Sequence, residues 1–395
     1  MASTTHTQRI QNGLESDIGP RERTDTVEGL HTLRAMAILL VFAYHYMVFV
    51  SHAPTFGWVS TVGWTGVDLF FVLSGYLIAN QIIVGVKSGK KLSLSAFYGR
   101  RLLRTLPNYY AVLALYLVFP IAMGGGTLPP VWKFLTFAQN YHLEPGTAFS
   151  HAWSLCVEEQ FYLLLPIGAL LVTRLKGSVR QVWCVLCMLT AVGIAIRCAL
   201  WHRFGPEADG GATEYYRNIY YATICRADEF LPGVAVAVIK NCHSGTWERL
   251  MSRGNLLLAS GISCTSVMFY LLLRYYQIED YGYGFAMTGF GYTLMAAAFA
   301  VLVAAALSKQ SLLNQVRIPG AAQLAELSYA IYLTHKPVST MMQRALLRHA
   351  ISASSYIGIL IITCTCLTAG WMLHTLIETP FMRLRGKYIP RNFVR

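Results

Sequence analysis

The chain has 395 residues, of which 55% are hydrophobic and only 13% are charged. Soluble domains carry about 25% charged residues, so this composition excludes an ordinary soluble protein. The formal net charge of +13 does not indicate nucleic-acid binding, because the basic residues gather in the connections between apolar stretches.

Apolar stretches of about 20 residues, long enough to cross a bilayer, recur along the chain. A polar head over residues 1–28, which we expect to be a disordered cytoplasmic tail, precedes the first of them. No small-residue cleavage site follows, so we interpret the first stretch as a retained helix. The predicted spans are 33–50, 61–86, 108–123, 155–173, 181–200, 224–240, 254–274, 287–307, 321–341 and 354–377. The sequence therefore predicts an all-α integral membrane protein, a bundle of about ten transmembrane helices over residues 29–385 with a basic tail over 386–395.

The positive charges predict the orientation of this bundle. The two terminal segments and alternate connections hold 23 of the 32 lysines and arginines, and the intervening connections hold 8. Positively charged loops stay in the cytoplasm, so we expect both termini to be cytoplasmic. Most of the nine cysteines lie in or beside the spans, where we interpret them as small packed side chains, and we expect no metal site.

The first span carries two residues that are costly at bilayer depth. Arg34 and His45 share one helix face and lie roughly 16 Å apart along the axis. Arg34 is equally well explained as an interfacial arginine that extends to the headgroups. His45 lies near the membrane midplane, where a titratable imidazole suits general-base or nucleophilic catalysis; a structural histidine is the alternative.

Acidic residues enter the next spans from the outer side. Asp68 lies about two turns into the second span, where it either orients His45 or bonds a neighbouring backbone group. Glu158 and Glu159 open the fourth span after Ser154, a favoured N-cap type. The helix dipole favours acidic groups there. Two adjacent carboxylates exceed what capping needs, so we predict that at least one binds substrate or handles a proton.

Two later spans also carry charged or titratable residues toward their outer ends. Arg226 and Asp228 open the sixth span and either form an ion pair, with each other or with Glu158, or bind substrate. His335 lies in the outer half of the ninth span. The opposite, cytoplasmic side has the basic loop 100–107, whose arginines suit phosphate groups, with anionic lipid as the alternative. The sequence thus predicts a phosphorylated donor inside and a polar acceptor outside.

Several blocks along the chain occur in a characteristic order and spacing. They are Arg34 with His45, residues 66–76 (GVDLFFVLSGY), Arg101 and Arg104 with Pro107, Gln139-Asn140, Trp153-Ser154-Leu155 continuing to Tyr162, Leu327-Ser328-Tyr329 continuing to His335, and residues 377–380 (IETP). Together they cover about residues 28 to 385 and resemble the acyltransferase-3 family. The sixth span departs from the family pattern, because Cys225 stands where a histidine is frequent.

The resemblance implies a ten-helix enzyme of the bacterial cytoplasmic (inner) membrane. Such an enzyme moves an acyl group, often acetyl, from cytoplasmic acyl-CoA to a hydroxyl of a polysaccharide, glycolipid or other acceptor. The resemblance places His45 as the catalytic histidine and Arg101 and Arg104 as the CoA-contacting pair. It implies a donor substrate, acyl-CoA, and no permanently bound cofactor. Many members add an SGNH-type domain after the helices; we expect transfer here to be completed in the membrane domain or by a partner.

These inferences define one working hypothesis. His45 acts as the base, or less favourably as an acyl carrier, with Glu158, Glu159 and Asp68 in the catalytic set. The predicted substrate-binding residues are Arg34, Arg101, Arg104, Asn140, Trp153, Ser154, Tyr162, Arg226, Asp228, Ser328, Tyr329 and His335. The expected partners are acyl-CoA, a carbohydrate or other hydroxyl-bearing acceptor, membrane lipid and a second copy of the chain.

Two rival functions stay open. A transporter or flippase of a glycan, lipid or small molecule also needs polar residues in its helices, but it does not require an arginine pair beside a membrane histidine. A sensor or scaffold without activity is disfavoured by the presence of His45 and Glu158.

Overall fold

The computed structural model of the protein describes residues 27–124, 126–206, 211–390 and 392–394. The predicted tail over residues 1–28 lies outside the described residues, apart from its last two positions. Glu28, at one of these positions, already begins helix α2 (Glu28–Tyr46).

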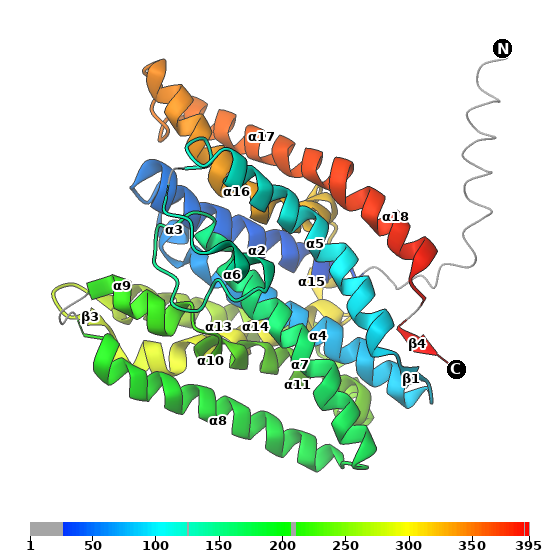
Figure 1. Cartoon of the computed structure of the whole chain (residues 1–395). Coiled ribbons are helices and arrows are strands. Elements are labelled where there is room, and N and C mark those ends of the chain that lie inside the picture. The colour runs from blue at the N-terminus through cyan, green and yellow to red at the C-terminus, as the bar shows by residue number, and fades with distance from the viewer. Residues whose placement is uncertain (1–26, 125, 207–210, 391, 395) are drawn as a thin grey trace.

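Helices packed side by side make up most of the described chain (Figure 1). After α2 the helices are α3 (Trp58–Val62), α4 (Gly66–Lys87), α5 (Leu94–Val118), α6 (Val131–Leu135), α7 (Trp153–Arg174), α8 (Val179–Phe204), α9 (Gly211–Tyr215), α10 (Thr223–Arg226), α11 (Leu231–Cys242), α12 (Ser244–Met251), α13 (Gly254–Tyr275), α14 (Tyr292–Leu307), α15 (Leu312–Gln315), α16 (Ala321–Arg348), α17 (Tyr356–Leu373) and α18 (Thr379–Tyr388). Short π- and 3₁₀-helical segments extend or join them: η1 (Met47–Ser51), η2 (Gly63–Thr65), η3 (Ser150–Ala152), η4 (Tyr216–Tyr220), η5 (Ala227–Phe230), η6 (Met287–Gly291) and η7 (His374–Glu378).

Two antiparallel pairs of two-residue strands complete the described elements. β1 (Lys91–Leu92) pairs with β4 (Phe393–Val394), and β2 (Gln277–Ile278) pairs with β3 (Gly282–Tyr283). The predicted basic tail over 386–395 therefore starts inside α18, and part of it is held against the connection between α4 and α5.

Seven helical stretches of the described residues are long and apolar enough to cross a membrane. They are Glu28–Ser51, Trp58–Lys87, Ser150–Arg174, Val179–Phe204, Gly254–Tyr275, Met287–Leu307 and Tyr356–Tyr388. The other three predicted spans overlap α5, α11 and α16. The prediction of an all-helical membrane bundle is confirmed, whereas the count of about ten spans and the cytoplasmic side of the termini stay predictions.

Helix α5 differs most from its prediction. It begins at Leu94, so the predicted basic loop over 100–107 is helical and the predicted span over 108–123 started too late. The hydroxyl of Ser93 caps the helix by accepting a bond from the amide of Ala96 (3.3 Å). Basic residues make the first half of α5 too polar to be recognised from apolar runs. Arg101 and Arg104 consequently belong to a helix of the bundle.

The helices divide into central and peripheral ones. Figure 1 shows α2 within the bundle and α8 and α17 at opposite edges. The peripheral α8, α13 and α17 leave large apolar side chains exposed, such as Leu189, Val267 and Leu360, and this exposure suits contact with lipid. The central α4 and α14 bury most of their residues, so chemistry that must be shielded from lipid belongs near them.

Helices α4 and α11 approach each other at glycines. A Cβ on Gly75 would lie 2.2 Å from the carbonyl oxygen of Phe230, and one on Gly233 would lie 2.0 Å from that of Val72. No side chain fits at these distances unless the backbones separate, which is why small residues mark such helix contacts. This contact fixes α4, which also packs on α2, the helix that carries His45.

Replacing Gly233 by alanine is expected to destabilise the fold by about 1–3 kcal/mol, the usual cost of overpacking a close contact. Thermal unfolding of the purified protein in detergent measures the effect. Gly168→Ala is the matched control, since a Cβ there meets no atom within 4 Å. Equal melting temperatures for the two variants would show that the α4–α11 contact tolerates a methyl group.

Candidate active site

Two histidines from distant parts of the sequence meet in the bundle. The rings of His45 of α2 and His335 of α16 lie edge to edge, with centroids 4.9 Å apart and planes 12° from parallel. Nδ1 of His45 lies 2.6 Å from Nε2 of His335. The sequence placed both residues in the outer half of the membrane and assigned His335 to substrate binding, but it did not predict that they bond each other.

The direction of this hydrogen bond follows from the second hydrogen bond that His335 makes. Nδ1 of His335 lies 2.9 Å from the carbonyl oxygen of Ile331, one turn earlier in α16. A carbonyl oxygen can only accept, so Nδ1 of His335 carries a proton, and in the neutral ring its Nε2 accepts. His45 therefore donates through Nδ1, and its Nε2 keeps a lone pair. The pair presents His45 in the tautomer that a general base requires.

A third histidine, His151 of η3, lies beside this pair. Its ring centroid is 5.6 Å from that of His335 and 6.2 Å from that of His45. Pro337 has no N–H for the carbonyl of Leu333, four residues earlier, and this freed carbonyl lies 3.2 Å from Nε2 of His151. In the part of the chain that the structure describes, no three His, Cys, Asp or Glu side chains are placed to hold a metal ion.

A buried lysine lies next to the three histidines. Nζ of Lys336 donates to the hydroxyl of Ser150 at 2.8 Å and lies 4.3 Å from the ring centroid of Phe49. Our interpretation of the sequence missed both His151 and Lys336 as site residues. Only their positions in the sequence could have indicated these two residues. His151 precedes the Trp153-Ser154 block, and Lys336 follows His335 inside a predicted span.

Arg101 forms a second cluster with the two predicted glutamates. Its Nη2 lies 3.2 Å from Glu158 and its Nε lies 3.7 Å from Glu159, while the guanidinium carbon is 3.4 Å above the ring centroid of Tyr162. Glu158 also accepts bonds from the hydroxyls of Tyr162 and Ser74, the latter at 2.7 Å. The carboxylates thus neutralise the arginine within the bundle.

This cluster corrects the predicted division of the site. The sequence placed Glu158 and Glu159 in an outer group, separate from a cytoplasmic arginine pair. In the structure the glutamates contact Arg101 directly. The reason is the early start of α5, which puts Arg101 inside the bundle opposite the first turns of α7.

A cavity of about 130 Å³, here called the inner pocket, surrounds this cluster. Its polar lining comes from five helices: Arg34, Ser74, Arg101, Arg104, Thr105, Ser154, Glu158, Glu159, Tyr162, Ser328, Tyr329 and Tyr332. Seven predicted substrate-binding residues therefore meet here: Arg34, Arg101, Arg104, Ser154, Tyr162, Ser328 and Tyr329.

One wall of the inner pocket connects it to the histidines. The hydroxyl of Ser154 lies 2.6 Å from that of Tyr332, which donates to the carbonyl oxygen of His151 at 2.5 Å. Ser154 is therefore not the N-cap that the sequence suggested. Helix α7 begins at Trp153 directly after η3, and its capping position is Ala152.

The other charged residues that the sequence singled out as site residues lie in buried ion pairs. Arg226 pairs with Asp68 (2.5 Å) and Glu229, whereas Asp228 takes both nitrogens of Arg197 at 2.6 and 2.9 Å. The predicted pairing of Arg226 with Asp228 or Glu158 is wrong, and Asp68 bonds an arginine instead of His45 or a backbone group. Both arginine side chains have no exposed surface, so they hold helices together at the centre of the bundle.

The last two predicted site residues belong to this structural region. The amide nitrogen of Asn140 donates to the carbonyl oxygen of Tyr221 and to the hydroxyl of Thr223, at 3.0 and 2.8 Å. The ring of Trp153 lies 5.1 Å from the guanidinium carbon of Arg226. Asn140 therefore ties an extended connection to the start of α10, and Trp153 covers the buried ion pair.

Comparison with known proteins identifies the family of the chain. A family model described as an acyltransferase domain matches residues 27–375, so the chain belongs to the acyltransferase-3 family. No solved structure matches the chain.

Several curated relatives are similar to the chain. The peptidoglycan O-acetyltransferase OatA of Listeria monocytogenes is 28% identical over 335 residues, which are 80% of this chain and 50% of the relative. The putative peptidoglycan O-acetyltransferase YrhL of Bacillus subtilis is 27% identical over 330 residues, 79% and 48% of the two chains. The O-acetyltransferase OatA of Staphylococcus aureus is 26% identical over 391 residues, 94% and 59%. The chain thus spans about half the length of the curated relatives it matches.

Removing the buried guanidinium in Arg226→Ala is expected to cost about 3–5 kcal/mol of stability, because it leaves Asp68 and Glu229 as buried charges without their partner. Arg217→Ala is the control. Its pair with Glu214 is about one-third exposed and is worth at most about 1 kcal/mol. Thermal or denaturant unfolding in detergent compares the two, and similar losses would refute a structural role for the buried cluster.

Proposed function

We propose that the protein is a membrane O-acetyltransferase of the bacterial cytoplasmic membrane. It takes an acyl group, acetyl by preference, from acyl-CoA on the cytoplasmic side and transfers it to a hydroxyl of a carbohydrate acceptor. Membership of the acyltransferase-3 family supports the reaction class, and the similarity to peptidoglycan O-acetyltransferases favours a peptidoglycan-type acceptor.

The observation that carries the proposal is the chain of hydrogen bonds from His45 through His335 to the carbonyl of Ile331. It leaves Nε2 of His45 as an unprotonated nitrogen in an apolar bundle. A base must have its lone pair available and its ring held in place, and this chain provides both conditions.

The proposed step balances without any further reagent. The acceptor hydroxyl gives its proton to Nε2 of His45 while its oxygen attacks the thioester carbonyl carbon. The tetrahedral intermediate collapses, the carbon–sulfur bond breaks, and the CoA thiolate takes the proton back from Nε2. While His45 is cationic, its Nδ1–H stays bonded to the lone pair of His335, which stabilises the imidazolium.

The contacts change the roles proposed for the acidic residues. Glu158 and Glu159 hold Arg101 and shape the inner pocket, so we assign them to positioning rather than to proton transfer. Asp68 acts on the site only by fixing Arg226 between α4 and η5. A covalent acetyl-histidine uses the same nitrogen of His45 and is distinguished by label that stays on the protein after acetyl-CoA is added without acceptor.

His45→Ala is expected to lower acyl transfer by about 10²–10⁴-fold, the usual contribution of a general base. His335→Ala is expected to lower it by about 10–100-fold, as for other groups that fix the orientation of a functional histidine. His335→Gln should recover part of this loss, because its amide oxygen still accepts from Nδ1 of His45. The assay is transfer from labelled acetyl-CoA to muropeptides by protein in nanodiscs.

The control for these variants is His349→Ala, which removes an exposed imidazole after the last turn of α16. It should leave the rate unchanged. Near-normal transfer by His45→Ala would eliminate His45 as the base, and equal rates for His335→Ala and His335→Gln would eliminate the proposed hydrogen-bond role of His335.

Donor binding separates this enzyme from a transporter of the acceptor. Acetyl-CoA at 100 times its Kd should raise the stability of the protein by about 2.7 kcal/mol, measured as a shift in thermal unfolding. The free acceptor sugar is the comparison. Protection by the sugar with no effect of acetyl-CoA would favour the transporter.

A further inference from the structure

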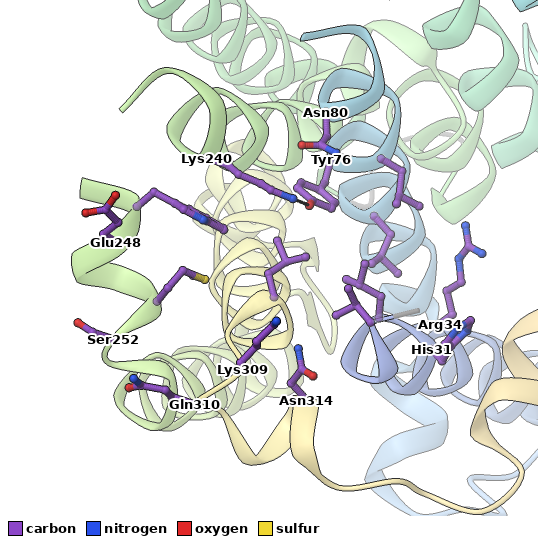
Figure 2. Close-up of a pocket in the computed structure, with 17 residues that line it drawn as sticks. His31, Arg34, Tyr76, Asn80, Lys240, Glu248, Ser252, Lys309, Gln310 and Asn314 are labelled. Atoms are coloured by element: carbon purple, nitrogen blue, oxygen red, sulfur yellow. Dashed lines mark hydrogen bonds between the residues drawn. The ribbon is translucent and has the colours of Figure 1, made fainter. Parts of the chain in front are cut away.

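A second and larger cavity opens beside the inner pocket (Figure 2). It has a volume of about 930 Å³ and lies between α2, α4, α11, α12 and the connection after α14. We call it the lateral pocket. Sites for small molecules usually measure about 300–1,000 Å³, so the lateral pocket suits a large ligand.

The charged side chains of the lateral pocket are mainly basic. His31, Arg34, Lys240 and Lys309 line it together with one acidic residue, Glu248. Figure 2 shows Lys240 and Lys309 on different walls, with Arg34 and His31 at another side. Such a concentration of one sign of charge in a low-dielectric cleft attracts anions.

The lysine charges have no carboxylate partner within the described part of the chain. Nζ of Lys240 donates to the hydroxyl of Tyr76 at 2.9 Å, and neither Lys240 nor Lys309 has a carboxylate oxygen within 4 Å. Arg101 differs, because Glu158 and Glu159 already neutralise it. The lateral pocket therefore offers two lysine cations that are available to a phosphate. In the inner pocket Arg101 is neutralised, whereas Arg104 has no carboxylate oxygen within 4 Å among the described residues.

The remaining lining favours an organic anion over inorganic phosphate. Trp247 supplies an aromatic ring, and Leu30 and Leu77 supply apolar surface. Asn80, whose oxygen accepts from Asn241 at 2.9 Å, keeps its amide N–H groups for another partner. An aromatic ring, amide donors and cations together match a phosphorylated nucleotide, since bases stack on aromatic rings.

The lateral pocket and the inner pocket share part of their walls. Arg34, Leu73 and Leu77 line both. Arg34 and His45 are separated by three turns of α2, roughly 16 Å along the axis. The two pockets therefore adjoin at Arg34, and a ligand whose charged end lies in the lateral pocket must pass this residue to reach the inner pocket.

We propose that the lateral pocket binds the phosphorylated nucleotide end of the acyl donor, with Lys240 and Lys309 on its phosphate groups. The acyl-bearing arm of the donor then passes Arg34 and enters the inner pocket. This assignment rests on the proposed function for the nature of the donor. It moves the phosphate contacts from Arg101 and Arg104, to which the resemblance assigned them, to Lys240 on α11 and Lys309 in the connection after α14.

The test measures CoA binding by protein in nanodiscs of phosphatidylcholine. The double variant Lys240→Gln, Lys309→Gln should weaken CoA binding by about tenfold or more, because charge-assisted bonds to phosphate are lost. Binding of pantetheine, which has no phosphate, should not change. In transfer assays the KM for acetyl-CoA should rise by a similar factor while kcat stays near the wild-type value.

Two further proteins keep this test specific. Lys240→Arg, Lys309→Arg preserves both charges and should retain CoA binding. Lys90→Gln, Lys176→Gln removes two exposed lysines outside the pocket and should behave as wild type.

Several outcomes would overturn the assignment. Unchanged CoA affinity in the Lys240→Gln, Lys309→Gln protein, with loss in Arg101→Gln, would return the phosphates to the inner pocket. Displacement of CoA by added phosphatidylglycerol would assign the lateral pocket to a lipid headgroup. Wild-type transfer with an unaffected double variant overturns only this inference. Lysine-dependent CoA binding without any transfer by the wild type overturns only the proposed function.

Discussion

A guanidinium group buried in a helix bundle is stable only where carboxylates meet it, and this requirement organises the centre of the protein. Arg226 joins Asp68 of α4 to Glu229 of η5, and Arg197 of α8 joins Asp228 to Thr293 of α14. Because both arginines are fully buried, neither helix pair can slide or rotate without exposing charge to an apolar environment. The ion pairs therefore set the depth and rotation of α4 against its neighbours.

Helix α4 transmits that constraint to the site. It packs on α2, which carries His45, and it contributes Ser74 to the inner pocket and Tyr76 to the lateral pocket. The glycines at 75 and 233 allow α11 to approach α4 closely enough to place Lys240 beside Tyr76. Asp68 of the buried ion pair and the pocket residues Ser74 and Tyr76 thus lie along the same helix but serve separate purposes.

The sequence predicted the helices better than the contacts between them. Apolar runs identify spans because the bilayer demands them, so α2, α7 and α13 lie close to their predicted ranges. The start of α5 was missed because its first half is basic, and with it the meeting of Arg101 and Glu158. Pairing among Asp68, Arg226 and Asp228 depends on helix rotation and on Arg197, which no local pattern singles out.

For the site as well, the sequence predicted where residues lie better than which residues they contact. Placing His45 and His335 at similar depth was within reach of a topology argument, but their hydrogen bond requires the relative rotation of α2 and α16. The hydrogen bond of His151 depends on a third residue as well. Its partner carbonyl is free only because Pro337 interrupts the hydrogen bonding of α16. Such a relation joins residues 182 positions apart and becomes visible only in three dimensions.

The bond from His335 to the carbonyl of Ile331 also determines where a proton can go. A peptide oxygen accepts a hydrogen bond but does not take up and release a proton under ordinary conditions, so the relay ends there. The proton that His45 receives has no exit through this chain, and in the proposed step it returns from Nε2 to the departing thiolate. In the proposed reaction, acyl transfer is therefore electroneutral. Its driving force is the thioester bond, and the proton gradient and the membrane potential contribute nothing to the step at His45.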